Sequence, residues 1–182
     1  YGEARPYLER AQAALEEGDG GQETASLRAE WLVMRSLVLQ MEGEAAESER
    51  LVREALATAP PPDAHARSLA TFALASVLRL REETAQALDA YRRAIHYSRE
   101  AGNAVAEMLS TVGLAGVAFE RGQLRLAAEI AGPVTARLEE SGSLPPISSV
   151  LYGVLGDVNY QWQRLDEARR YGERALQLST LG

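Results

Sequence analysis

The sequence predicts an all-α protein built from antiparallel helical hairpins, and three observations point to this class. First, 46% of the 182 residues are hydrophobic but only 6% are aromatic; a chain dominated by Ala and Leu favours close-packed helices over a sheet. Second, the nine residues that begin at Glu3 (EARPYLERA) return at Glu167 (EARRYGERA) with seven of nine positions identical. Third, small residues recur at a constant spacing, which indicates a repeated structural unit.

The spacing of small residues predicts where helices cross. In four places a small residue lies twelve positions before another. The pairs are Ser36 and Ser48, Ala75 and Ala87, Ala115 and Ala127, and Gly156 and Ala168. Each pair indicates two antiparallel helices that cross closely, because a large side chain would hold the helices apart. A second small residue follows seven positions later in three of the repeats, at Ala55, Ala94 and Ala175.

This order of small residues resembles the tetratricopeptide repeat (TPR) motif over nearly the whole chain. The resemblance implies an all-α, TPR-like right-handed superhelix of about nine helices, with repeats of about 40 residues and a concave face lined by the first helix of each hairpin. The third repeat departs from the motif, because Val134 stands where Ala is expected. Pro133 beside it removes a helical hydrogen bond, so we expect a kink or break near Gly132 and Pro133.

The expected elements are arranged in one domain over residues 1–182. They are a lone helix at 1–18 and hairpins at 23–58, 64–100, 104–140 and 145–179. Asp63 is the expected N-cap of the second hairpin. The tight turns within hairpins are expected at Glu42–Gly43, Arg81–Glu82, Arg121–Gly122 and Gln163–Arg164. Because the chain opens at Tyr1 rather than Met, we expect a fragment of a larger protein.

Composition excludes several classes of function. A net charge of −7 provides no basic footprint for direct contact with nucleic acid or an anionic membrane. The absence of Cys excludes disulfides and thiolate metal sites. No apolar run reaches the roughly 18 residues of a membrane span, and no signal peptide is present, so we expect a cytoplasmic location. No phosphate-binding loop occurs, and no cofactor is expected.

Catalytic and metal-binding clusters are not predicted. His65 and His96 lie in different hairpins without a carboxylate at ligand spacing, so they are interpreted as surface or half-buried residues. Adjacent acids such as Glu139 and Glu140 do not share a helix face and are interpreted as solvated helix ends. We therefore expect no enzyme activity in this segment.

The inner face of the helical array is the candidate binding surface. In TPR arrays the positions three before, one after and four after the first small residue face inward. In the four hairpins these positions hold Val33, Leu37 and Gln40; Phe72, Ser76 and Arg79; Val112, Gly116 and Phe119; and Gly153, Asp157 and Tyr160. From them we select six candidate ligand- or partner-binding residues: Phe72, Ser76, Arg79, Phe119, Asp157 and Tyr160. The alternative is that Phe72 and Phe119 belong to the core between repeats and that Arg79 is merely solvated.

Four runs extend the resemblance beyond a generic TPR. They are residues 55–60 (ALATAP), 78–81 (LRLR), 101–103 (AGN) and 155–168 (LGDVNYQWQRLDEA). With them the chain resembles the helical-repeat region of large LuxR-type bacterial transcription activators related to the maltose-regulon activator. In that family a nucleotide-switching ATPase precedes the repeats, a helix-turn-helix domain follows them, and the repeats sense the inducer.

The resemblance implies a non-catalytic sensor or scaffold segment of a transcription regulator. Its partners would be a peptide, protein or small-molecule inducer in the groove, together with the other domains of the parent regulator. This segment itself would contact neither nucleic acid nor membrane. The alternative is a TPR adaptor that binds a peptide segment of a partner protein.

Overall fold

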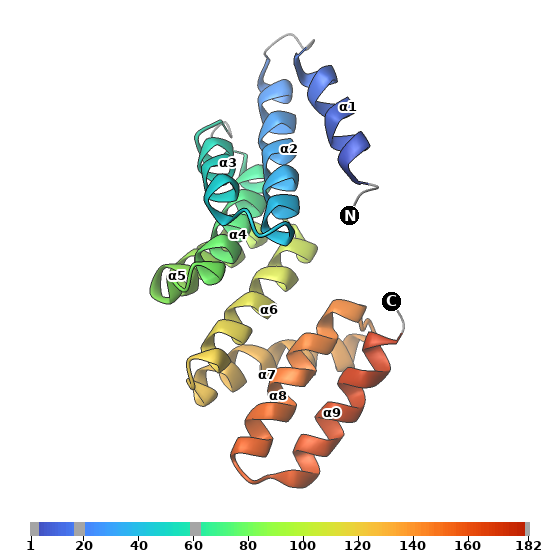
Figure 1. The fold of residues 1–182 in the computed structure, drawn as a ribbon. Helices are drawn as coiled ribbons and strands as arrows, with labels where there is room; N and C mark the ends of the chain where they lie inside the picture. The colour runs from blue at the N-terminus through green and yellow to red at the C-terminus, as the bar shows by residue number, and fades with distance from the viewer. Residues whose placement is uncertain (1–3, 17–20, 59–62, 181–182) are drawn as a thin grey trace. The chain divides into compact units, whose positions relative to one another are not determined.

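The chain is helical throughout the part that the structure describes. A computed structural model describes residues 4–16, 21–58 and 63–180 (Figure 1). Within these ranges the chain forms nine α-helices and one short 3-10 helix, and no strand. The helices are α1 (Ala4–Glu16), α2 (Gln22–Met41), α3 (Ala45–Thr58), α4 (Ala64–Leu80), α5 (Thr84–Glu100), α6 (Ala104–Glu120), α7 (Leu124–Ser141), η1 (Pro146–Ser148), α8 (Ser149–Gln161) and α9 (Leu165–Ser179). The predicted all-α class of helical hairpins is thereby confirmed.

Contacts between residues divide the chain into two compact units, residues 1–107 and 108–182. The boundary lies inside α6. Unit 1 contains α1 and the hairpins α2–α3 and α4–α5, whereas unit 2 contains the end of α6, α7 and the hairpin α8–α9. Each unit has its own packing, and the expectation of one domain over residues 1–182 stays a prediction.

Small residues lie where the helices of unit 1 cross. Ser36 in α2 and Ser48 in α3 are fully buried, and the Ser48 Oγ donates a hydrogen bond to the Ser36 carbonyl at 3.0 Å. Ala75 in α4 and Ala87 in α5 are also fully buried. A hydroxyl that bonds to the backbone of the opposite helix requires close helix axes, so the predicted crossing of α2 and α3 is confirmed.

The closest backbone approach in unit 2 involves Gly156 of α8. A Cβ atom at Gly156 would lie 3.4 Å from the Ala168 carbonyl oxygen and 3.4 Å from the Gly172 amide nitrogen, both in α9. The crossing of α8 and α9 at the predicted pair is thereby confirmed. A Cβ at this distance is in van der Waals contact with the backbone of α9, so the crossing leaves no space for a side chain much larger than a methyl group.

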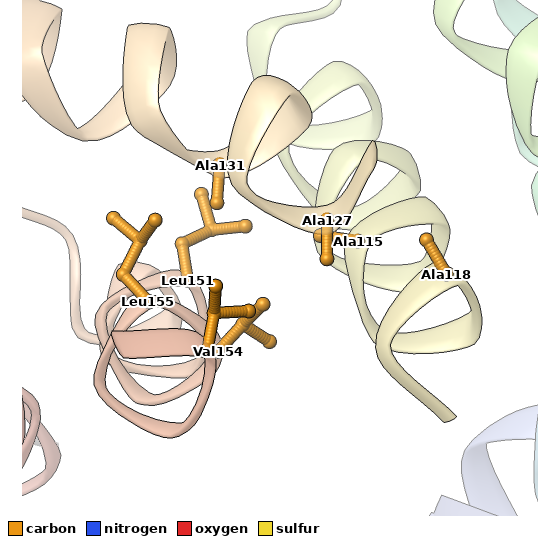
Figure 2. Close-up of a cluster of buried hydrophobic side chains, with 8 residues drawn as sticks. Ala115, Ala118, Ala127, Ala131, Leu151, Val154 and Leu155 are labelled. Carbon is orange, nitrogen blue, oxygen red and sulfur yellow. The ribbon is translucent and has the colours of Figure 1, made fainter. Parts of the chain in front are cut away.

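The buried core of unit 2 joins α6, α7 and α8 (Figure 2). Its buried members are Ala115, Ala118, Ala127, Ala131, Leu151, Val154, Leu155 and Val158. The predicted pair Ala115 and Ala127 therefore lies in one cluster. Because half of this core is alanine, the helices pack with little side-chain volume between them.

The turns within the four hairpins share one conformation. One residue in each turn has a left-handed backbone, namely Gly43 (φ 84°), Glu82 (φ 61°), Gly122 (φ 68°) and Gln163 (φ 61°). The next amide donates a hydrogen bond of 2.9 Å to the carbonyl five residues earlier, from Glu44 to Leu39, Glu83 to Leu78, Gln123 to Ala118 and Arg164 to Asn159. This pairing is the Schellman closure of a helix C-terminus. The last turn lies one residue earlier than predicted.

The break expected at Pro133 is absent, because α7 continues from Leu124 to Ser141 with Pro133 inside it. The Pro133 side chain is exposed, so the carbonyl that loses its helical partner lies on the solvated side of the helix and can bind water instead. The Thr135 hydroxyl also donates to the Ala131 carbonyl at 3.2 Å, one turn back. Of the expected kink or break, the break was therefore wrong, and the kink stays a prediction.

Asp63 caps α4 as predicted. Its Oδ1 accepts a hydrogen bond from the Ala66 amide at 2.9 Å. Its Oδ2 accepts a hydrogen bond of 2.6 Å from the Ser26 hydroxyl of α2, so the cap also ties two hairpins of unit 1 together. Among the helices that the structure describes, none is both long enough and apolar enough to cross a membrane.

Candidate functional site

The three candidate residues of unit 1 lie on α4 with different degrees of exposure. Phe72 and Ser76 are half-buried, whereas Arg79 is exposed. The Phe72 ring centroid lies 6.3 Å from that of the buried Tyr91 in α5. This ring contact within the hairpin favours the alternative that Phe72 is partly a core residue. Arg79 is the most accessible member of this triplet.

The inward positions of α2 do not form an open surface. Val33 is only 1% exposed, so the interpretation that it lines a groove was wrong. Val33 is buried because this part of α2 packs closely against its neighbours, as the buried Leu32 and Ser36 also show. Gln40 is half-buried, and its Nε2 donates a hydrogen bond of 3.4 Å to the Ala73 carbonyl in α4. It therefore connects the first helices of two successive hairpins rather than pointing freely to solvent.

The three candidate residues of unit 2 divide in the same way. Phe119 of α6 is half-buried and packs against the cluster of buried side chains in Figure 2, which favours its assignment to the core. Asp157 and Tyr160 of α8 are exposed, with 61% of Tyr160 accessible. Since they are three residues apart on one helix, they share a face. Asp157 and Tyr160 thus form an accessible polar and aromatic patch.

A separate cavity of about 490 Å³ lies between α7, α8 and α9 of unit 2. Its lining residues are Gly132, Thr135, Ala136, Glu139, Tyr152, Arg170, Tyr171, Glu173, Arg174 and Gln177. None of the six predicted site residues is among them. Sequence reasoning missed this cavity, and Glu139 is not the simple solvated helix end that was expected.

In this cavity the Glu139 carboxylate accepts hydrogen bonds from two side chains, and the three residues come from three different helices. The Tyr152 hydroxyl of α8 donates a hydrogen bond of 2.7 Å to Glu139 Oε1 of α7. From α9, Arg174 donates through Nε to Oε1 at 3.2 Å and through Nη2 to Oε2 at 3.3 Å. Tyr152 is only 2% exposed, so its hydroxyl has little access to water as an alternative partner. The network joins the three helices and uses both carboxylate oxygens.

The network shifts the protonation equilibria of its members. The hydrogen bond from Tyr152, followed by the one from Arg174, lowers the pKa of Glu139. Burial, with the neighbouring Glu139 carboxylate as the next cause, raises the pKa of Tyr152 to about 12. At neutral pH the site therefore holds a charged carboxylate, a charged guanidinium and a neutral phenol.

Replacing Glu139 by glutamine should make the free energy of unfolding depend less on pH in the acidic range. A carboxyl whose folded-state pKa is depressed stabilises the fold above its unfolded pKa, and this contribution is lost as the pH falls through the folded value. The wild type should therefore exceed Glu139→Gln in free energy of unfolding at pH 7, by no more than about 1 kcal/mol because the pair is partly screened. The difference should shrink below about pH 4. Urea titrations at several pH values measure it.

The matched control for this prediction is Glu140→Gln. Glu140 is an exposed neighbour that makes no ion pair or hydrogen bond with any residue the structure describes. Its replacement should leave the pH dependence as in the wild type. A difference between Glu139→Gln and the wild type that stays constant from pH 7 to pH 3 would contradict the proposed linkage.

The two histidines contact polar side chains. The His65 Nδ1 lies 3.2 Å from the Asn103 side-chain amide, and its Nε2 lies 3.7 Å from Glu30. His96 lies 3.5 Å from Glu100, one turn along α5. Over residues 4–16, 21–58 and 63–180, no three His, Cys, Asp or Glu residues gather in a geometry that could hold a metal ion.

Known structures share this fold. The crystal structure of BtubC (BKLC) from P. vanneervenii is similar over 100% of this chain and 72% of that protein, with a TM-score of 0.76 and 19% identity. Two crystal structures of nearly identical TPR-like repeats from a Podosopora anserina putative kinesin light chain, one of them a point variant, each align with 96% of this chain and 93% of theirs. Their TM-scores are 0.66 and 0.64, at 16% identity.

A sequence family accounts for most of the chain. The model of the MalT-like TPR region matches residues 29–181. This range includes α3 to α9 and most of α2, so it contains nearly all of the four hairpins. The chain therefore belongs to the family of MalT-like TPR regions.

Proposed function

We propose that this chain is the non-catalytic sensor or scaffold segment of a LuxR-type transcription regulator related to the maltose-regulon activator. The observation that carries the proposal is the match to the MalT-like TPR region over residues 29–181. TPR repeats typically provide binding surfaces rather than catalysis, since each hairpin contributes a face to an extended array. The parent regulator would supply DNA binding and nucleotide switching through other domains.

The accessible polar residues of the first helices are the proposed contact points for an inducer or partner. In unit 1 these are Ser76 and Arg79, and in unit 2 they are Asp157 and Tyr160. Arg79 offers donors for a carboxylate, Asp157 offers acceptors for a donor group, and the Tyr160 ring offers apolar contact. A ligand changes the state of the parent regulator only if it binds one of the regulator's conformations more tightly than the other.

The reading frame that encodes the chain distinguishes a regulator from a TPR adaptor. A regulator of this class requires a helix-turn-helix domain in the same frame after the codon for Gly182. Sequencing of the complete gene tests this. A frame that encodes a helix-turn-helix supports the proposal, and one that ends without it identifies the adaptor alternative.

Substitutions on α8 should separate sensing from folding. In the full-length regulator, Asp157→Ala and Tyr160→Ala should raise the inducer concentration for half-maximal reporter transcription by about tenfold, which corresponds to the loss of one good contact. In the isolated chain both should change the free energy of unfolding by no more than about 0.5 kcal/mol, because the side chains are exposed. Glu167→Ala, on the exposed start of α9, is the control. An unchanged inducer response in both variants would exclude this patch.

A further inference from the structure

Unit 1 contains a cavity that corresponds to the one between α7, α8 and α9. It has a volume of about 400 Å³ and lies between α3, α4 and α5, so each cavity joins the last helix of one hairpin to both helices of the next. Its lining residues are Arg53, Leu74, Leu78, Ala85, Gln86, Asp89 and Arg93. The two linings share three positions of the repeat, at which the residues of the two cavities can be compared.

The charges of the two cavities differ at two equivalent positions, since Arg53 and Asp89 of unit 1 correspond to Gly132 and Arg170 of unit 2. In α5, Asp89 and Arg93 form an internal ion pair of 3.1 Å. They lie two and six positions after the small residue of the helix crossing. The same two positions of α9 hold Arg170 and Arg174. Arg174 instead pairs with Glu139 of α7. Each cavity thus has two arginines in its lining, and in the second cavity one of them is Arg170, at the position of the acid Asp89.

Arg170 remains a cation with unused donors. Glu173, the other acid of the cavity lining, pairs with Arg169 at 2.9 Å. Within the part of the chain that the structure describes, the Arg170 guanidinium makes no ion pair and no hydrogen bond. Its central carbon instead lies 4.9 Å from the ring centroid of Tyr171. Stacking on an aromatic ring holds a guanidinium in place while its N–H groups stay available to a ligand.

Gly132 makes room for a ligand beside this cation. Five positions after the first small residue of the second helix, the other hairpins carry long side chains, namely Arg53, Arg92 and Glu173. The third hairpin has Gly132 there, and a Cβ atom on Gly132 would meet nothing within 4 Å. The wall of the cavity on α7 is completed by the small Ala136. The third repeat therefore leaves this part of the cavity wall without the side chain that the other repeats carry.

We propose that the cavity between α7, α8 and α9 binds a small organic acid, whose carboxylate accepts hydrogen bonds from the Arg170 guanidinium. The planar fork of arginine matches the two oxygens of a carboxylate. The carbon skeleton of the acid lies against Tyr171 and Ala136, and a volume of about 490 Å³ is within the usual range for small-molecule sites. Both oxygens of Glu139 already accept hydrogen bonds from Tyr152 and Arg174. The Arg170 guanidinium acts on this carboxylate through its charge and not through a hydrogen bond, so its donors remain for the ligand.

The site is independent of the proposed regulator role. It contains none of Ser76, Arg79, Asp157 and Tyr160, and it lies wholly within unit 2. A cavity that fails to bind acids would leave the proposal for the inner face intact. In the same way, the absence of a helix-turn-helix from the gene would leave the acid site intact.

A matched pair of probes tests the requirement for a charge. Benzoate and benzamide share a ring and differ in that only benzoate carries an anionic group, so calorimetric or NMR titration of the chain with each separates charge from shape. Benzoate should bind saturably, and benzamide should bind at least about tenfold more weakly, as expected for loss of a charge-assisted hydrogen bond. Equal affinity for the two probes, or no saturable binding of benzoate, overturns the proposal.

Two substitutions test the location. Arg170→Gln should weaken benzoate binding about tenfold or more. Arg125→Gln, at an exposed arginine of α7 outside the cavity lining, should leave it unchanged. Gly132→Leu should fill the cavity and abolish binding without lowering the thermal midpoint, because leucine is a better helix former than glycine. Retention of wild-type affinity by either Arg170→Gln or Gly132→Leu overturns the assignment.

Discussion

Replacement of Gly156 by leucine is expected to destabilise the chain by about 2–3 kcal/mol. Even the first added atom, Cβ, would lie 3.4 Å from the Ala168 carbonyl oxygen and the Gly172 amide nitrogen. These are backbone atoms of α9, which cannot rotate away as a flexible side chain can. The remaining three carbons of leucine fit only if α8 and α9 move apart, and this separation exposes apolar surface along their whole contact.

The control for this prediction lies one turn earlier on the same helix. Gly153→Leu introduces the same side chain, but a Cβ atom at Gly153 would meet nothing within 4 Å. This variant should equal or slightly exceed the wild type in stability, because leucine has the higher helix propensity. Urea unfolding followed by circular dichroism measures both. Equal losses in the two variants would mean that the close crossing at Gly156 is not what limits side-chain size there.

Truncation of Leu151 to alanine is expected to cost about 3–4 kcal/mol. Leu151 is fully buried and belongs to the core of unit 2 shown in Figure 2. The cost of such a truncation depends on how far the neighbours can move into the void. Here many of the neighbours are alanines, such as Ala127 and Ala131, whose single methyl groups cannot extend into the space. The loss should therefore lie in the upper half of the usual range for this substitution.

Val150→Ala provides the comparison for Leu151→Ala, since Val150 precedes it on α8 and is 42% exposed. Its truncation should change the free energy of unfolding by about 0.5 kcal/mol or less. Both variants should retain the denaturant slope of the wild type, which reports the surface exposed on unfolding. A loss below about 1 kcal/mol for Leu151→Ala would show that the alanine-rich core rearranges more freely than its packing indicates.

The helices and their crossings were predictable because their signals are local or periodic. Small residues at a fixed spacing, such as Ala75 and Ala87, report a close approach of two helices without knowledge of the rest of the fold. Asp63 is recognisable as a cap for the same reason. The error at Pro133 arose because sequence alone does not tell which side of the helix faces solvent, and an exposed proline disturbs a helix less than a buried one.

The candidate site was less predictable, because its residues are brought together by packing. Glu139 is separated in the sequence by 13 residues from Tyr152 and by 35 residues from Arg174. No sequence motif links the three residues. Val33 was assigned wrongly because a repeat template gives the direction of a side chain but does not tell whether neighbouring side chains cover it. A signal was nevertheless present, since aligning the hairpins shows Gly132 as a departure from the long side chains that the other repeats carry at its position.

The turn conformation shared by the four hairpins also affects how repeats can be added to such a chain by duplication. Gly43, Glu82, Gly122 and Gln163 all adopt the same left-handed backbone, so the joint between paired helices does not depend on one amino acid. A hairpin duplicated in tandem would carry a functioning joint with it, and later changes in the copy could alter its faces without rebuilding the connection. The array can thus lengthen first and diversify afterwards, with Gly132 as an example of a change in one copy that the other copies do not share.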